Sequence, residues 1–440
     1  MPQKPKNNTH QRRAQTADRM RKTLGKRQGP KSLCLTMIVK NESHNMPRLL
    51  DSLESIVDMI AITDTGSTDN TPEVITNWGK EHNIPTVVHH EPFTDFGYNR
   101  TYSVQAAKKS FPNADYFLLS DADFVWEIKD FDKCLLTDHK YLVEQYNKAM
   151  RYWNIRILSS KADFECFGVT HEYWDNATTQ TDYGGEIRTA KINELKINDL
   201  EDGGCKDDKF VRDERLLRAR LADPKTKPGL LTRYKFYLAQ TLKDMKRYLE
   251  AIEYYHERIK DKGWVEELYY AKFQIGFCYE NLGWNAKRAI SIYSQAEKSE
   301  EELAFCKLQN PNNLSIKDFA ALITKYFEES AVNYMAAYTF RKTRAEAIYY
   351  LTRLYRSQEL HEMAFKTAMM GNKIKYPHED SLFVEHGCYD YLFDWELSIV
   401  CYYIPSQKKV GREAIKRLMV RDDLPDYINS VMDRNRQGYL

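Results

Sequence analysis

The chain reads Tyr116-Phe-Leu-Leu-Ser-Asp-Ala-Asp123 where an apolar run meets two acidic residues. The run predicts a buried strand whose carboxyl end carries both carboxylates. Hard oxygen ligands suit Mg²⁺ or Mn²⁺, and such a cation can bridge carboxylates and a diphosphate. A D-x-D pair is also common in solvated loops and at helix N-caps. Other motifs must therefore decide between a metal diphosphate site and an ordinary loop.

Two further predicted strands end in polar motifs. Leu33 to Val39 reads as a buried strand that runs into Lys40-Asn41-Glu42, and Met59 to Thr63 reads as another that ends in Asp64-Thr-Gly-Ser-Thr-Asp69. The apolar runs alternate with helical stretches, which predicts βαβ units and a parallel sheet. Ligands of such sheets bind beyond the carboxyl ends of the strands. The three motifs should therefore meet at one crevice.

In this order and spacing, Met37 to Glu42, Asp64 to Asp69 and Ser120 to Asp123 resemble the motifs of family 2 glycosyltransferases with the α/β GT-A fold. The resemblance implies a UDP-sugar donor, and Mn²⁺ or Mg²⁺ held by Asp123. It implies that Asp64 holds the edge of the uracil ring. The nucleotide-binding residues that it implies in these motifs are Val39, Asn41, Glu42, Asp64, Gly66, Ser67, Asp69, Asp121 and Ala122.

The segment Phe93-Thr-Asp-Phe-Gly-Tyr-Asn-Arg100 resembles a further element of that family, D-F-S-x-x-R-N, which lies beside the nucleotide. It departs from the pattern twice, because Gly97 replaces the usual Ser and Asn99-Arg100 stands in the reverse order. The resemblance places Asn99 and Arg100 at the donor, with Arg100 on the diphosphate. The alternative is an arginine on a helix face that pairs with a neighbouring acid.

An inverting transfer needs a carboxylate that takes the proton of the acceptor. Family 2 enzymes place this base after the D-x-D, and Glu172 in Gly168-Val-Thr-His-Glu172 is the best positional match. His171 or Asp202 would complete the metal shell. The alternatives are a packed loop histidine and a turn residue before Gly203-Gly204. The Gly168–Glu172 motif, together with a repeat region behind it, also resembles bacterial peptide S-glycosyltransferases of the same family.

Beyond about residue 215 the chain reads as long helical stretches that repeat. Ala251 and Ala289 occupy equivalent positions 38 residues apart, and Ala364 follows 75 residues later, about two such periods. This spacing predicts tetratricopeptide-like helical pairs. Asn281-Leu-Gly283 is expected to form the turn of the second pair. The predicted organisation is a basic arm over residues 1–31, a GT-A domain over 32–215 and a helical repeat domain over 216–440.

Composition places the chain among soluble globular proteins. An apolar content of 42% in 440 residues is ample for packed cores, and a net charge of +2 gives no reason to expect nucleic acid as a partner. The arm is the exception, with ten Lys or Arg and one acid, and we expect a solvated tail rather than a partner-binding segment. No secretory h-region precedes the first predicted strand, no stretch of 18 apolar residues occurs, and the cysteines form no CxxC pair. We therefore expect no membrane span and a cytoplasmic protein.

These observations predict an inverting, metal-dependent glycosyltransferase whose repeat domain shapes or recruits the acceptor. A protein or peptide acceptor is favoured by the repeats, which would also allow homo-oligomers, and a glycan or small molecule stays open. The alternative is a repeat scaffold that carries an inactive nucleotide-sugar fold. A nucleotidyltransferase would need a glycine-rich phosphate loop after the first strand. Val39-Lys-Asn-Glu42 contains no glycine, which argues against this class of enzyme.

Overall fold

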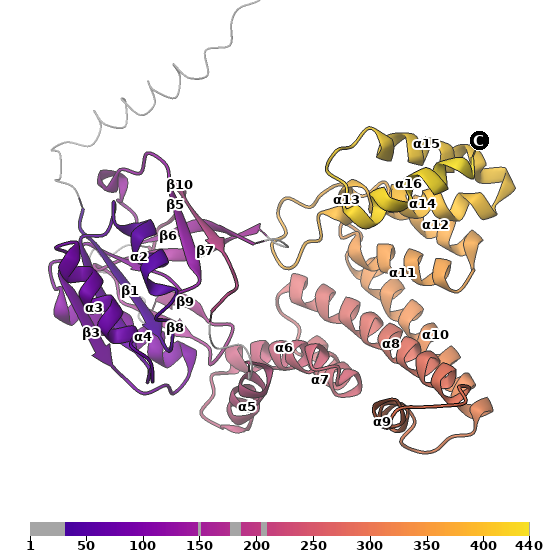
Figure 1. Ribbon diagram of the computed structural model, residues 1–440, viewed down its shortest axis with the longest axis horizontal. Coiled ribbons are helices and arrows are strands. Elements are labelled where there is room, and N and C mark those ends of the chain that lie inside the picture. The colour runs from indigo at the N-terminus through magenta and orange to yellow at the C-terminus, as the bar shows by residue number, and fades with distance from the viewer. Residues whose placement is uncertain (1–30, 148–150, 177–185, 204–208, 440) are drawn as a thin grey trace, which may run out of the picture. The chain divides into compact units, whose positions relative to one another are not determined.

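The computed structural model describes residues 31–147, 151–176, 186–203 and 209–439. The chain divides into two compact units, unit 1 up to Asp207 and unit 2 from Asp208 onward (Figure 1). The predicted boundary at residue 215 falls inside helix α5 (Lys209–Ala222). This helix packs against α6 (Pro228–Asp244) in unit 2. The predicted basic arm lies outside the described residues, except for Lys31.

Unit 1 is built on a mixed sheet with the strand order β3-β2-β1-β4-β7-β6-β10-β5. The first four are parallel, as the βαβ pattern predicts, whereas β7 runs antiparallel to β4 and β6, and β5 antiparallel to β10. A separate hairpin pairs β8 with β9. The strands are β1 (Leu33–Val39), β2 (Met59–Asp64), β3 (Thr86–His90), β4 (Tyr116–Leu119), β5 (Phe124–Ile128), β6 (Lys140–Tyr146), β7 (Arg151–Ser159), β8 (Phe164–Phe167), β9 (Tyr173–Asn176) and β10 (Thr189–Asp199).

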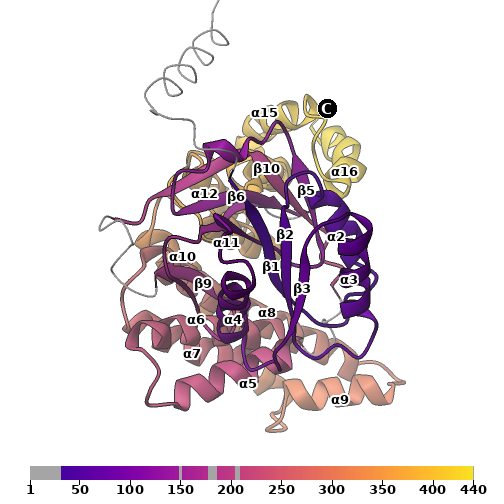
Figure 2. The same ribbon diagram turned by 90° about the vertical axis from the view of Figure 1, so that its left-hand side faces the viewer.

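Helices cover both faces of the parallel half of the sheet (Figure 2). Alternate residues of β1 point to opposite faces: Leu33 and Leu35 pack into the core below α2 (Met46–Leu53) and α3 (Thr71–Glu81), and Cys34 packs into the core below α4 (Phe96–Ser110). Helix α2 buries residues at the spacing of one helical face, namely Met46, Leu49, Leu50 and Leu53. This α/β architecture agrees with the GT-A expectation, and it leaves the carboxyl edge of the sheet open to loops.

Unit 2 is helical throughout the part that the structure describes. Its main helices are α6 (Pro228–Asp244), α7 (Tyr248–Lys260), α8 (Val265–Tyr293), α9 (Glu300–Gln309), α10 (Ile316–Phe340), α11 (Glu346–Ser357), α12 (His361–Gly371), α14 (Leu392–Val400), α15 (Lys408–Met419) and α16 (Asp426–Gln437). Short turns join α6 to α7 and α11 to α12, so these two pairs match the predicted repeat units. Over the described ranges, none of the helices is long and apolar enough to cross a membrane.

The predicted turn at Asn281-Leu-Gly283 is wrong, because α8 continues through it as one helix to Tyr293. The glycine serves packing instead of a turn. A Cβ at Gly283 would lie 2.7 Å from Cε1 of Phe327 on α10, and a Cβ at Gly276 would lie 2.6 Å from Cδ1 of Tyr334. Both glycines therefore let aromatic rings of α10 approach the backbone of α8. The sequence alone does not separate a packing glycine from a turn glycine.

Candidate active site

The sheet brings the three sequence motifs to one edge. Val39, the last residue of β1, pairs with Asp64, the last residue of β2. On the other side of β1, Thr36 pairs with Leu119, which ends β4 just before Ser120. The loops after β1, β2 and β4 therefore leave the sheet side by side, as the parallel pattern predicts.

Asp64 closes the loop that follows β2. Its carboxylate is buried and accepts backbone hydrogen bonds from Ser67 at 3.1 Å and from Gly66 at 3.3 Å. Gly66 has a φ of 109°, a conformation that favours glycine, so the loop can fold back on the carboxylate. Nδ1 of the exposed His90 lies 3.4 Å from Asp64 Oδ2. Asp64 thus has a fixed orientation, beside a histidine that no sequence motif indicated.

The loops after β1 and β2 are tied to each other. The backbone N–H of Asn41 donates to Ser67 Oγ at 2.9 Å, and Thr68 N–H donates to Asn41 Oδ1 at 2.7 Å. Asp69 accepts from Ser43 N–H at 3.2 Å and from Thr71. These bonds outweigh the opposing effect of burial and lower the pKa of Asp69 to about 2. Hydrogen bonds of Asn41, Ser67 and Asp69 therefore hold the two loops together at the carboxyl edge of the sheet.

Two arginines neutralise Asp121. Arg100 Nη2 donates to Asp121 Oδ1 at 2.6 Å, and Arg156 Nη1 donates to Oδ2 at 3.2 Å. Burial alone would raise the pKa of Asp121, but the two guanidinium groups outweigh it and lower the pKa. Arg156 also donates to Gln145 at 2.7 Å and stacks over the ring of Phe124. Arg156 was not singled out from the sequence, where the available signal was an arginine between Ile155 and Ile157, since a buried arginine needs a partner.

Arg100 joins Asp121 to Glu172. Its Nε lies 2.7 Å from Glu172 Oε1, an ion pair without the geometry of a directed hydrogen bond. Arg100 thus pairs with acids from two other segments, and its contact with the diphosphate stays a prediction. Glu172 and the exposed His171, which has a φ of 51°, lie in the loop between β8 and β9. The predicted base is thus connected to Asp121 through a single side chain, that of Arg100.

Asp123 lies among other carboxylates. Burial raises its pKa to about 6, and the charges of Asp121, Asp199 and Glu42 act in the same direction. A Cβ at Gly203 would lie 3.2 Å from Asp123 Oδ2 and 3.3 Å from Glu42 Oε1, so the segment after β10 passes against both acids. Asp199, which sequence reasoning missed, ends β10 and accepts from Gln145 Nε2 at 2.9 Å. Its only sequence signal is an acid at the end of a strand.

The predicted metal ligands do not converge as a set. Asp202 pairs with Arg48, and His171 lies in the β8–β9 loop. Among the residues that the structure describes, no group of three or more His, Cys, Asp or Glu is placed to hold a metal ion. Asp123 and Glu42 still fit a Mg²⁺ or Mn²⁺ ion that takes its other ligands from a diphosphate and water. Burial and, after it, the neighbouring negative charges raise the pKa of Asp123, and such a cation would offset the crowded charge.

Asn99 does not face the donor edge. Its side chain is completely buried, accepts from Thr94 N–H at 2.8 Å and donates to Pro92 O at 3.1 Å. The expectation that Asn99 contacts the nucleotide is therefore corrected, because its amide braces the loop before α4. Ala122 is buried, and Val39 contributes its carbonyl to Thr65 N–H at 2.9 Å. Val39 thus contributes to the edge through its backbone.

The lack of space around Gly97 explains why the usual Ser is absent at this position. A Cβ there would lie 2.5 Å from the carbonyl oxygen of Gly168 and 2.8 Å from that of Cys166. We expect Gly97→Ala to lower the free energy of unfolding of unit 1 by about 1–3 kcal/mol through overpacking. Urea denaturation would measure the change, with Gly229→Ala as the control, because nothing lies within 4 Å of that Cβ position. Equal effects of the two substitutions would refute the close contact.

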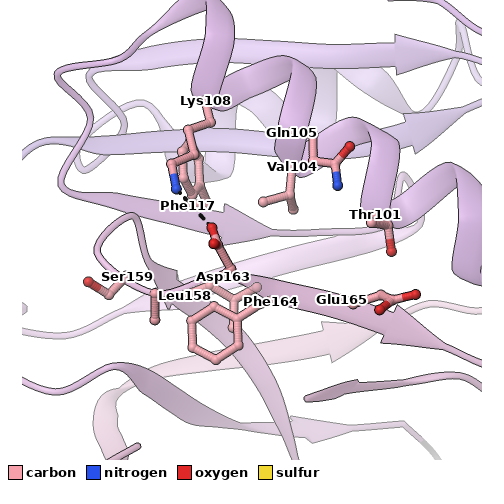
Figure 3. Close-up of a pocket in the computed structure, with 11 residues that line it drawn as sticks. Thr101, Val104, Gln105, Lys108, Phe117, Leu158, Ser159, Asp163, Phe164 and Glu165 are labelled. Carbon is pink, nitrogen blue, oxygen red and sulfur yellow. Dashed lines mark hydrogen bonds and ion pairs between the residues drawn. The ribbon is translucent and has the colours of Figure 1, made fainter. Parts of the chain in front are cut away.

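A pocket of about 450 Å³ lies elsewhere in unit 1, between α4 and the β7–β8 region (Figure 3). Val104, Phe117, Leu158 and Phe164 form its apolar wall, and an ion pair of 3.1 Å between Lys108 and Asp163 crosses it. None of Asp64, Asp121, Asp123 and Glu172 lines it. The convergence of carboxylates and arginines, rather than this cavity, therefore locates the candidate active site.

A comparison with protein families matches the part of unit 1 that contains Asp64, Asp121 and Asp123. Residues 34–154, which lie in unit 1, match the model of glycosyl transferase family 2. A TPR repeat-containing protein of Synechococcus elongatus is 35% identical over 100 residues, which are 23% of this chain and 22% of that protein. The chain therefore spans about a fifth of the length of the curated relative that it matches.

Two solved structures show weaker likenesses. Staphylococcus aureus TarS 1-349 in complex with UDP is 11% identical, covers 72% of this chain and 93% of its own, and has a TM-score of 0.27. Glucosyl-3-phosphoglycerate synthase from Mycobacterium tuberculosis is 14% identical, covers 33% of this chain and 50% of its own, and has a TM-score of 0.20. At these TM-scores neither likeness carries an argument about this chain.

Proposed function

We propose that this protein is an inverting glycosyltransferase that moves a sugar from a UDP-sugar to an acceptor, with Mn²⁺ or Mg²⁺ at Asp123. The observation that carries the proposal is the cluster at the carboxyl edge of the sheet, in the unit whose residues 34–154 match glycosyl transferase family 2. There Arg100 links Asp121 to Glu172, and the charge of Asp121 acts on Asp123. A helical repeat unit behind this domain favours a protein or peptide acceptor, since such repeats present extended binding surfaces.

In the proposed reaction, a bond forms between the acceptor atom and the anomeric carbon, and the bond from that carbon to the diphosphate oxygen breaks. Glu172 takes the proton of the acceptor, and the negative charge leaves on UDP. The cation, held by Asp123 and Glu42, would supply charge that stabilises the departing diphosphate. Arg100 fixes the orientation of Glu172 and at the same time holds Asp121. Asp64, whose carboxylate is held by backbone N–H groups of its own loop, would accept a hydrogen bond from the edge of the base.

A thermal-shift screen of nucleotide sugars, with and without Mn²⁺, tests this function. A ligand that binds only the native state raises the melting temperature by mass action. We expect UDP-sugars with Mn²⁺ to raise it most, and the same sugars with EDTA to raise it little. The absence of a shift with every nucleotide sugar would refute the proposal. UDP binding without release of UDP from any donor would favour a scaffold with an inactive fold.

The choice of nucleotide tests Asp64. If its carboxylate accepts the N3 hydrogen of uracil, CDP should bind less well by about 1–3 kcal/mol, because the N3 of cytosine carries no hydrogen and one buried polar group stays unpaired. Competition of UDP, CDP and GDP against a labelled UDP measures the difference. In Asp64→Asn the gap between UDP and CDP should shrink. Equal affinities in the wild type would remove Asp64 from this role.

A further inference from the structure

Arg48 and Asp202 form a bidentate ion pair at the rim of the candidate active site. Arg48 Nη1 donates to Asp202 Oδ2 at 2.9 Å, and Nη2 donates to Oδ1 at 2.8 Å. Arg48 belongs to the first turn of α2, and Asp202 follows β10, 154 residues later. The side chains keep 36% and 45% of their surface exposed. A pair this exposed adds little to stability, so a stronger ligand can replace either partner at small cost.

The guanidinium of Arg48 is close enough to the candidate metal carboxylates, Asp123 and Glu42, to feel their charge. Its pKa is raised first by the hydrogen bonds to Asp202, and also by the negative charges of Asp123 and Glu42. Gly203, the residue after Asp202, lies against the same two carboxylates. Asn45, at the start of α2, donates to Glu42 Oε2 at 2.9 Å and contacts the carbonyl oxygen of Asp202 at 3.4 Å. The ion pair and the carboxylates therefore form one continuous surface.

A guanidinium that binds a carboxylate through two parallel N–H groups has the geometry that also suits a phosphate. The carboxylate of Asp202 presents two oxygens to Arg48, as a phosphate would. A diphosphate bound to a cation on Asp123 and Glu42 would also lie close to Asp202 and Gly203, because Gly203 is next to both carboxylates. A donor phosphate that reached Arg48 would therefore compete with Asp202 for the guanidinium.

We propose that Arg48 is a binding residue for the donor diphosphate, and that Asp202 is the counterion that occupies its guanidinium until the donor displaces it. The inference rests on the proposed function, because it concerns the phosphates of the same donor. It also gives Asp202 a role different from the metal ligand that the sequence suggested. The hydrogen bonds from Arg48, which lower the pKa of Asp202, keep that carboxylate charged and engaged with the arginine while no donor is bound.

Calorimetric titration with UDP and with uridine tests this inference. Arg48→Met should weaken UDP binding by about ten- to a hundredfold, since charge-assisted hydrogen bonds are lost. Asp202→Asn should tighten UDP binding by about two- to fivefold, since the competing carboxylate is removed. In the double variant Arg48→Met/Asp202→Asn, the gain from Asp202→Asn should vanish. Uridine, which has no phosphate, should bind equally well to all of these variants.

The matched control is Arg188→Met, because Arg188 and Asp138 form another Arg–Asp pair of unit 1, at 2.7 Å. It should leave both affinities unchanged. A wild type that binds UDP, with an unchanged affinity in Arg48→Met, would overturn the inference and leave the proposed function standing. Weaker UDP binding in Asp202→Asn, or equal losses for uridine and UDP in Arg48→Met, would also overturn it. A wild type that binds no UDP would overturn both proposals.

Discussion

Glu172→Gln should lower the rate of sugar transfer by about two to four orders of magnitude while the affinity for UDP persists. The amide keeps the shape of the side chain, and its oxygen can keep the contact with Arg100 Nε, which is 2.7 Å long in the native pair. It cannot take the proton of the acceptor. UDP release from a UDP-sugar identified in the screen measures the rate, with water as the acceptor until the natural one is found.

Glu165→Gln is the matched control for this prediction. Glu165 lies on β8, close in sequence to Glu172, but it lines the separate pocket beside α4 (Figure 3). Its substitution should leave the rate of UDP release within about twofold of the wild type, which corresponds to less than ~0.5 kcal/mol. A normal rate in Glu172→Gln, together with a lost rate in Asp123→Asn, would move the base to another acid of the cluster, with Asp199 or Asp202 as candidates.

Asp123→Asn should abolish the part of UDP binding that depends on Mn²⁺ and reduce transfer to background, because the carboxylate that holds the cation is gone. The wild type should show a matching pH dependence. Burial raises the pKa of Asp123 to about 6, so protons compete with the cation. Affinity for UDP with Mn²⁺ should therefore fall as the pH is lowered through about 6, and recover when it is raised.

Calorimetry of UDP binding, with Mn²⁺ and with EDTA, measures both effects. Asp163→Asn serves as the control, because Asp163 is an exposed acid of unit 1 that pairs with Lys108 outside the cluster. It should bind UDP as the wild type does. Equal affinity in Mn²⁺ and EDTA, or a normal affinity in Asp123→Asn, would contradict the metal assignment.

Local patterns in the sequence predict the parallel half of unit 1 well. Leu33 to Val39 is the strand β1 with the predicted bounds, and the motifs at Asp64 and Asp121 lie at the same edge, because parallel strands place their carboxyl ends together. The helix pairs around Ala251 and Ala364 are also as predicted. In each case the apolar periodicity of the segment itself carries the information.

Contacts between distant segments explain what the sequence did not predict. Arg156 reaches Asp121 across 35 residues, and Arg48 reaches Asp202 across 154 residues, so no local spacing reveals either pair. Asp202 was assigned to the metal shell from the family resemblance, which carries no information about its partner Arg48 on α2. Asn99 looked like a donor contact, but its partners are backbone groups of the loop before α4. Gly283 was misread because a ring on α10 decides its role.

The most direct test of the central claim, that the carboxylate cluster of unit 1 is a sugar-nucleotide site, is a crystal structure of the protein soaked with UDP and Mn²⁺. The account predicts uracil beside Asp64, the cation on Asp123, and the diphosphate within hydrogen-bonding distance of Arg48 after its separation from Asp202. UDP bound elsewhere, for example in the pocket between Val104 and Phe164, with the Arg48–Asp202 pair intact and the cluster empty, would contradict it.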